Sequence, residues 1–413
     1  MSRLSMLFVW LSLCCIPARA SAQARAATQP LPRDLDLNAL FQRVESSRRA
    51  RVEAALALAV RGDVRTAGQH PNPELTYDGA GFLGGQETNG GSQHQIVLTQ
   101  RLLWPGQMDR RIDAATARWA LADAQVDVLR AELSLEIWRA ALVLSAAHER
   151  TLVARASLDR LERIVAILRG RSEAGAGRRW DVVRAESERA SLQSALDLAS
   201  VEEAQAANMI AVLLGAPSWQ PESVPTLAAL SPHVTTAAAE LHPRRVAAQR
   251  ALAAAEAQAR MEHALALPPI ELGIGTILSS APEGGYVLGR ISMPIPLFDA
   301  NQGAIERAER ERDASELARD ATERELEARA AHSRAALTRL QASLAALDTE
   351  GTARLPQLAE MAETAFTGGE VSAFELIETL QSIYVIRARR VEVELEVRLA
   401  ELAAVAAMQG RVR

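Results

Sequence analysis

The chain has 413 residues, of which 48% are hydrophobic, 23% charged and only 4% aromatic, and its formal net charge is −5. This mild acidic balance gives no support for nucleic-acid binding, so no nucleic-acid partner is expected. Abundant alanine, leucine and charged residues with few aromatic ones are typical of long helices and coiled coils, rather than of several globular domains.

The first 22 residues have the pattern of a secretory signal peptide. Arg3 precedes an apolar run from Leu4 to Ile16, and small-residue cleavage sites follow near Ala20 and Ala22. The run is too short to serve as a permanent transmembrane helix. Residues 1–22 are therefore predicted to be a signal peptide, and the mature protein is expected to leave the cytoplasm.

Nothing in the sequence predicts an enzyme, a metal site or a cofactor. Cys14 and Cys15 are the only cysteines and lie in the predicted signal peptide, so the mature chain is expected to carry no thiol or disulfide. Lipidation at Cys14 is not expected, because the bulky Leu13 precedes it. No phosphate-binding loop or nucleophile motif occurs. The seven histidines lack metal-ligand spacing: His70, His94, His148, His233, His242, His263 and His332.

The chain repeats one arrangement of segments with a period of about 190 to 195 residues. We expect a first repeat at 23–215 (helix, β-hairpin, long helix and return helix), a proline-rich connector at 216–240, and a second repeat at 241–413. The long helices are expected from about Gln107 to Gly170, roughly 95 Å, and from about Gln302 to Phe366. Apolar spacings of three and four along both helices are typical of coiled coils.

Each repeat also contains two alternating segments that predict a β-hairpin. The segments run from Glu74 to Phe82, Gln93 to Leu102, Ile270 to Leu278 and Tyr286 to Met293. Their lengths are close to the 9–11 residues of a membrane-crossing strand, whereas no apolar stretch after the signal peptide approaches the ~20 residues of a transmembrane helix. Four strands cannot close a membrane barrel, which needs about eight. The chain is therefore expected to share a barrel with copies of itself, and a trimer would supply twelve strands.

Several short motifs, taken in their order and spacing, resemble the TolC outer-membrane factor family, in particular its cation-efflux branch of CzcC- and CusC-like proteins. They are Asn72 to Leu75, Pro105 to Gln107, Ala174-Gly175, Trp180 to Glu186, Leu213 to Pro217, Pro296 to Gly303 and Gly368-Gly369. One departure is Ala300, where that branch often has Arg.

The resemblance implies a mainly α protein with membrane β-strands: a trimeric TolC-like cylinder with four strands per chain in a shared 12-stranded barrel and a coiled-coil periplasmic tunnel. Residues 216–240 would then lie at its equator. It also implies a place in the cell outer membrane among outer-membrane lipid. The expected partners are two further copies, a periplasmic membrane-fusion adaptor and an inner-membrane pump, of the resistance-nodulation-division (RND) type.

The resemblance predicts a passive exit duct of a tripartite efflux system, with heavy-metal cations or small toxic compounds as substrates and metal resistance as the outcome. Two alternatives remain open. The first is an outer-membrane exit for a type I protein secretion system, because the pump rather than the duct chooses the cargo. The second is a periplasmic coiled-coil scaffold without a pore, which leaves the two predicted hairpins unexplained.

Candidate gate residues follow the two glycine-containing helical turns. Asp181 and Glu375 stand just after the turns, and an acidic ring there would favour cations. The alternative is that Asp181 caps the returning helix, and the two roles are compatible. Arg178 and Arg179 are expected to pair with these acids across protomers.

The turns themselves are expected to dock the adaptor through their backbone. Their glycines are Gly175 and Gly177 in the first half and Gly368 and Gly369 in the second. The alternative role of these glycines is to form the turns, since each pair interrupts a helical pattern.

Overall fold

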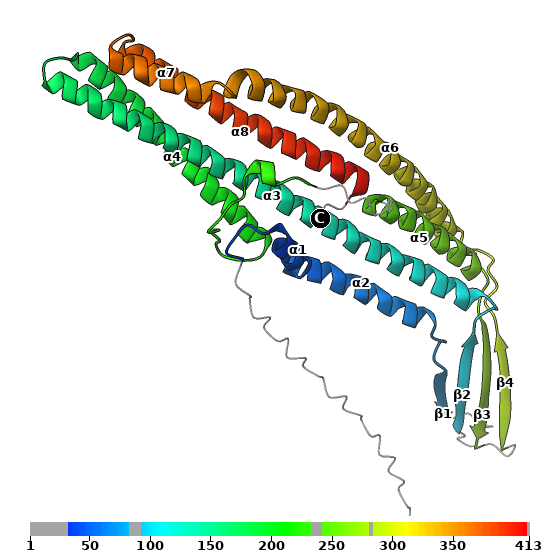
Figure 1. Cartoon of the computed structure of the whole chain (residues 1–413). Coiled ribbons are helices and arrows are strands. Elements are labelled where there is room, and N and C mark those ends of the chain that lie inside the picture. Colours follow the sequence, from blue (N-terminus) through cyan, green and yellow to red (C-terminus); the bar gives the residue numbers. More distant parts are fainter. Residues whose placement is uncertain (1–31, 82–91, 233–241, 281–283, 411–413) are drawn as a thin grey trace, which may run out of the picture. The chain divides into compact units, whose positions relative to one another are not determined.

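The computed structural model describes residues 32–81, 92–232, 242–280 and 284–410. The predicted signal peptide, the glycine-rich hairpin tip at 84–91 and His233 lie outside the described residues. The protein is mainly helical with one four-stranded antiparallel sheet, as expected (Figure 1). None of the described helices has an apolar stretch long enough to cross a membrane.

The order of elements is the same in the two halves of the chain. In the first half a helix leads into a hairpin, a long helix and a return helix, and the second half repeats this order. The elements are α1 (Leu37–Glu45), α2 (Arg48–Ala67), β1 (Glu74–Gly81), β2 (Ser92–Leu102), α3 (Gln107–Glu173), α4 (Arg179–Leu213), α5 (Pro243–Leu265), β3 (Ile270–Ser279), β4 (Gly285–Ser292), α6 (Gln302–Ala346), α7 (Leu355–Gly368) and α8 (Ala373–Gln409). Each strand end lies within one residue of its predicted position.

The two hairpins join into one sheet with the order β1-β2-β3-β4, so β1 and β4 are its edges. In antiparallel pairing, directly opposed residues share a face. The register therefore places most of the sheet's exposed apolar side chains on one face, which we call the apolar face: Leu75, Tyr77, Ile96, Leu98, Leu102, Leu272, Ile274, Leu278, Val287 and Ile291. One face of the sheet is thus hydrophobic and uncovered within the single chain.

The opposite face, which we call the polar face, is charged near the helices and tightly packed in its middle. Arg101 and Glu271 are directly opposed and form an ion pair of 3.1 Å. Val97 is 2% exposed beside Gly275, where a Cβ atom would come within 2.3 Å of the Ile96 carbonyl oxygen. Only glycine fits at this close approach of β2 and β3.

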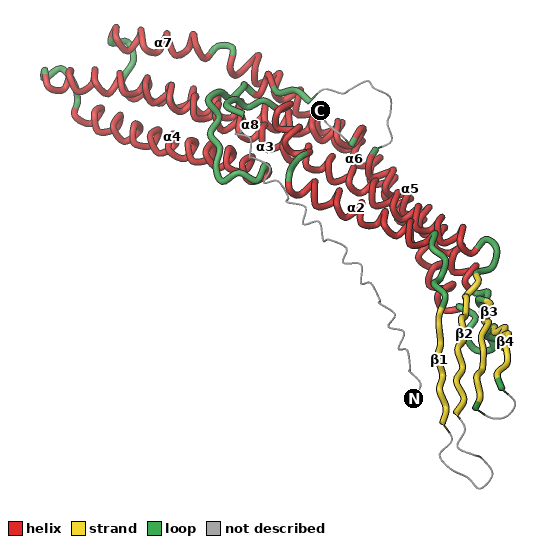
Figure 2. The backbone as a smooth tube through the Cα atoms, turned by 90° about the horizontal axis from the view of Figure 1, so that it is seen from below, coloured by secondary structure: helices red, strands yellow, loops and turns green. Residues whose placement is uncertain are grey.

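The helices differ in how many neighbouring helices they contact within the chain. The long helix α3 contacts two sets of shorter helices, α2 with α4 and α5 with α8, whereas α6 contacts only α5 and α8 among the long helices (Figures 1 and 2). Burial follows this arrangement, because 23 of the 67 residues of α3 are buried but only 3 of the 45 of α6. The helix α6 therefore has one partnered side and one open side.

The second long helix is not continuous, which corrects the expectation of an uninterrupted helix to about Phe366. It ends as α6, passes through a π-helical segment at Leu347–Thr352, and resumes as α7. Pro356 is the second residue of α7. Proline has no N–H and its ring clashes with the carbonyl four residues earlier, so a regular helix cannot run through this point.

The described part of the proline-rich connector, residues 216–232, packs onto the helices. Leu227 is fully buried, and its backbone N–H donates to the Glu149 carboxylate at 2.7 Å. The Ser145 hydroxyl of α3 donates to the Pro225 carbonyl, and the Trp219 indole N–H donates to the Pro32 carbonyl at 2.8 Å. The bonds to Ser145 and Glu149 fasten the connector midway along α3, and the Trp219 bond ties it to the segment before α1.

Candidate functional site at the helical turns

Both predicted turns lie at the end of the helices that is far from the sheet, which we call the turn end (Figures 1 and 2). The Ala176 N–H donates to the Arg171 carbonyl, and the Glu370 N–H donates to the Ala365 carbonyl, each at 2.8 Å. The two bonds are related by one shift of 194 residues (171 to 365 and 176 to 370). Such a bond to the carbonyl five residues earlier, donated by the residue after a left-handed glycine, defines a Schellman ending, so both turns have the same backbone form.

Two of the four predicted turn glycines are required by backbone conformation. Gly175 and Gly369 have φ angles of +74° and +81°, a region that side-chain-bearing residues rarely adopt. Gly177 has an ordinary φ, but an added Cβ would lie 3.1 Å from the Arg171 Cβ. Gly368 has free space around it, with no neighbouring atom closer than 4.0 Å. Docking of a partner by these glycines remains a prediction.

Glu375 forms a capping box at the start of α8. Its backbone N–H donates to the Ser372 hydroxyl, while its carboxylate accepts from the Ser372 backbone N–H at 2.7 Å and from the Ser372 hydroxyl. The backbone hydrogen bond, and then the hydroxyl hydrogen bond, hold the pKa of Glu375 below its ordinary value. The carboxylate is exposed and charged at neutral pH, and it also begins the helix.

Asp181 differs from Glu375 although the two occupy equivalent positions. It is the third residue of α4, whose N-cap residue Arg178 makes no side-chain cap bond. Among the described residues, no hydrogen bond or ion pair involves the side chains of Arg178, Arg179 or Asp181. Asp181 therefore lies near the positive end of the helix dipole without capping it, and its carboxylate is free for another role.

The structure adds an aromatic and cationic cluster that the sequence reasoning did not assign. Trp180 and Phe374 stack with ring centroids 6.5 Å apart, and the Arg184 guanidinium lies 4.3 Å from the Phe374 centroid and 5.8 Å from that of Trp180. The rings occupy equivalent positions in the two repeats. In the sequence, the signal for this cluster is an aromatic residue directly before the acid in each half. The contact between the two rings forms only because α4 and α8 begin side by side.

A buried core supports this end of the molecule. Leucine and isoleucine side chains of α3, α4 and α8 surround the Phe366 ring of α7. On the surface, Arg169 pairs with Glu186, and Arg160 pairs with Glu363 at 2.9 Å. The turns are thus held to each other by α3, which contacts both return helices.

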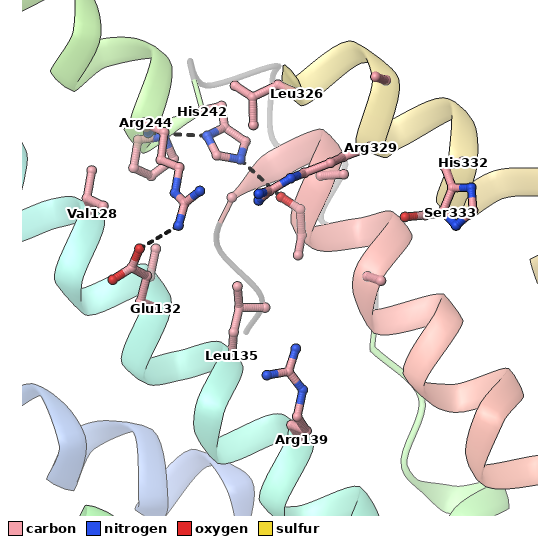
Figure 3. A pocket seen from close by; sticks show the side chains of 17 residues that line it. Val128, Glu132, Leu135, Arg139, His242, Arg244, Leu326, Arg329, His332 and Ser333 are labelled. Atoms are coloured by element: carbon pink, nitrogen blue, oxygen red, sulfur yellow. Dashed lines mark hydrogen bonds and ion pairs between the residues drawn. The ribbon is translucent and has the colours of Figure 1, made fainter. Parts of the chain in front are cut away.

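A second feature is an open pocket of about 490 Å³ where the end of α8 meets the start of α5, between α3 and α6 (Figure 3). His242 is the N-cap of α5: its Nδ1 accepts from the Arg244 N–H, and its Nε2–H donates to the Ala406 carbonyl, each at 3.2 Å. This pair of bonds requires the neutral ring. Within the described residues, no cluster of histidine and acidic side chains has the arrangement of a metal site.

His242 is expected to make the protein less stable in acid. Burial is the main cause that lowers its pKa from the ordinary 6.5, and the positive charges of Arg244, Arg245 and Arg329 lower it further, against the raising effect of the Ala406 bond. Below pH 6.5 the His242 side chain binds a proton in the unfolded chain, whereas in the folded chain it stays neutral until a lower pH. The stabilisation is therefore complete above pH 6.5 and is lost as the pH falls through the folded-state pKa.

The measurement is thermal unfolding between pH 8 and pH 5. His242→Asn keeps an N-cap acceptor without a titrating group, so its stability should vary less with pH than that of the wild type. His242→Ala should lose about 1 kcal/mol at pH 8, as cap removal does. Equal pH slopes for the wild type and His242→Asn would contradict this role.

Comparison with solved structures defines the class of the fold. The chain is similar to CusC (18% identity, TM-score 0.76, 94% of this chain and 95% of that chain), to a membrane protein from Pseudomonas aeruginosa (20%, 0.78, 91% and 92%) and to the open state of the MtrE outer membrane channel from Neisseria gonorrhoeae (19%, 0.74, 91% and 89%). The fold is therefore that of the TolC-type channels. No curated protein sequence matches this chain significantly.

The sequence itself supports the same class. Residues 235–410 match the family of outer membrane efflux proteins. This match covers the second half of the chain, while the fold of the described chain as a whole is similar to that of the outer-membrane channels named above. The family match supports the expected place in the outer membrane and the expectation that the chain is a channel rather than an enzyme.

Proposed function

We propose that the protein is one subunit of a trimeric exit duct in a tripartite efflux system. The observation that carries this proposal is the sheet, whose apolar face is uncovered and whose polar face carries charges, at one end of a long helical unit. A sheet with these two faces suits a barrel wall between lipid and a water-filled lumen.

Within its described residues, each protomer leaves two sets of surfaces without a partner, the edges of the sheet and one side of α6, and a trimer would cover both. The edges β1 and β4 carry unpaired backbone groups, which do not occur exposed in the hydrocarbon region of a membrane. On the helices, α6 lacks the second pair of neighbours that α3 has. The complementary surface lies on α2 and α4 of another copy, where apolar side chains are exposed: Val52, Leu56, Leu198, Val201, Met209 and Val212. Three copies would close such a ring with twelve strands.

The partners we propose are a periplasmic adaptor at the turn end and an inner-membrane pump of the RND type. The Trp180, Phe374 and Arg184 cluster offers an exposed aromatic surface beside the turns. The substrates we propose are heavy-metal cations or small toxic compounds, supported by the free Asp181 carboxylate and the resemblance to the cation-efflux branch. A protein-secretion exit remains the alternative, because the duct does not choose its cargo.

Channel conductance in planar bilayers tests the duct and its acidic entrance together. Asp181→Asn should reduce the preference for cations, because it removes a negative charge from the entrance. In the part of the chain that the structure describes, the Asp181 side chain makes no bond that holds the fold, so a change in selectivity would report the charge. Glu375→Gln removes the charge while keeping a capping-box residue, so any change in selectivity reports the charge itself. Glu378→Gln, an exposed acid one turn further along α8, is the matched control.

The outcomes separate the alternatives. Cation-selective channels that lose selectivity in Asp181→Asn but not in Glu378→Gln would support both the duct and the entrance. Channels unaffected by either variant would keep the duct and leave Asp181 without a gating role. Well-folded protein that forms no channel would favour the periplasmic scaffold.

A further inference from the structure

The corner between β2 and α3 is docked onto another part of the same chain. Gln107, the first residue of α3, is only 3% exposed. Its side-chain oxygen accepts from the Trp104 N–H, and its side-chain nitrogen donates to the carbonyls of Ala264 and Leu267 at 2.7 and 2.9 Å. The Trp104 indole N–H donates to the Pro268 carbonyl at 2.6 Å. The corner thus binds the segment that connects α5 to β3.

The corner between β4 and α6 has the same form, but among the described residues its glutamine does not reach a strand connection; the Asn301 side chain instead ties the corner to α5, donating to the Glu262 carbonyl at 2.9 Å. Gln302 is the first residue of α6, and its side-chain oxygen accepts from the Ala300 N–H at 2.7 Å. The residues before the two helices, Gly106 and Asn301, are both left-handed, with φ angles of +85° and +63°. The Gln302 nitrogen, however, only turns back to the Phe298 carbonyl at 3.0 Å, and the side chain is exposed.

The second corner also exposes an unusual amount of apolar surface. Phe298 is 93% exposed, and Leu297 and Ile295 are 75% and 73% exposed. Phe298 precedes Gln302 by four residues, whereas Trp104 precedes Gln107 by three. A fully exposed aromatic ring within an apolar segment indicates a contact surface.

The chain also contains the segment that would fit this corner. The equivalent of α5 in the first repeat is α2, since both lead into the first strand of a hairpin. The connection from α2 to β1, residues 68–73, is therefore equivalent to the α5–β3 connection. It is largely exposed, and it belongs to a helix that packs on α3 and not on α6, so the α6 corner of the same chain does not hold it.

We propose that residues 68–73 of a second copy occupy the β4–α6 corner, with Gln302 donating to their backbone carbonyls and Phe298 packing where Trp104 packs in the first repeat. This interface rests on the proposed trimer. The internal repeat favours a second copy over another partner. The β2–α3 corner already binds the α5–β3 connection, and residues 68–73 are the equivalent connection in the first repeat. Each copy then offers one corner and one connection, which is the head-to-tail pattern that closes a ring.

Cysteine cross-linking of the full chain in membranes tests the contact. Because the mature chain is expected to carry no thiol of its own, the double variant Phe298→Cys with Pro71→Cys should form products of two and three chains under mild oxidation or with a short bismaleimide. Either single variant should form no ladder. The matched control, Trp104→Cys with Pro268→Cys, should cross-link within one chain and give no product of higher mass.

The size of the uncross-linked protein separates this interface from the trimer itself. A trimer in detergent whose 298–71 pair stays uncross-linked, while the 104–268 control reacts, would overturn the interface and leave the trimer standing. A monomeric protein would overturn the trimer first. As a second variant that needs no new thiol, Phe298→Asp should lower the fraction of trimer at least tenfold, and an unchanged fraction would contradict the proposal.

Discussion

Replacing Gly275 with valine is expected to impair assembly of the proposed trimer strongly. A Cβ atom at this position would lie 2.3 Å from the Ile96 carbonyl oxygen and 2.9 Å from a Val97 methyl group, and neither the backbone nor the buried valine can move away without breaking the β2–β3 pairing. Overpacking of this kind costs roughly 1–3 kcal/mol or more, so the yield of trimer should fall about tenfold or further.

The control for Gly275 is a second strand glycine with free space. Gly289 in β4 has no atom within 4 Å of an added Cβ, and the register places it on the apolar face. Gly289→Val should therefore assemble like the wild type. Trimer yield by size-exclusion chromatography in detergent, with both variants expressed side by side, measures the difference. Equal yields would show that β2 and β3 do not approach as closely as described.

The second large effect is expected in the core below the turns. Leu376 is fully buried among apolar side chains of the turn end. Leu376→Ala removes buried methyl groups and leaves a cavity, which costs about 2–5 kcal/mol in the free energy of unfolding. Because this core holds the two turns together, the loss should be concentrated at the turn end while the sheet remains intact.

Limited proteolysis and thermal unfolding measure this loss. Leu376→Ala should expose the helices near the turns to protease at a lower temperature than in the wild type. Glu378→Ala is the control on the same helix, because Glu378 is exposed and its replacement should change stability by no more than about 0.5 kcal/mol. If both variants unfold alike, the turn-end core contributes little to stability.

The elements of the fold could be predicted from local patterns. The strands end within one residue of their predicted positions because proline and glycine bound them and because apolar residues alternate along them. The interruption before α7 was missed, although Pro356 carried the signal. Proline cannot stand in the interior of a regular helix, so its position predicts the break.

The candidate site was predictable in part. The glycine turns and the acids after them follow from the repeat, and the Ser372 and Glu375 pattern is that of a capping box. The different roles of Asp181 and Glu375 could also be predicted from the sequence, because they depend on whether the residue before the helix supplies a hydroxyl. Ser372 does, whereas Arg178 does not.

By itself the sequence determined the repeated order of helix, hairpin, long helix and return helix, because each element depends on neighbours along the chain. Only the tertiary structure decided which elements meet: that β2 pairs with β3, that Arg184 lies over rings from both halves, and that Gln107 is docked while Gln302 is exposed. Such contacts join residues far apart in the chain, and their free energy depends on packing and burial that no local pattern records.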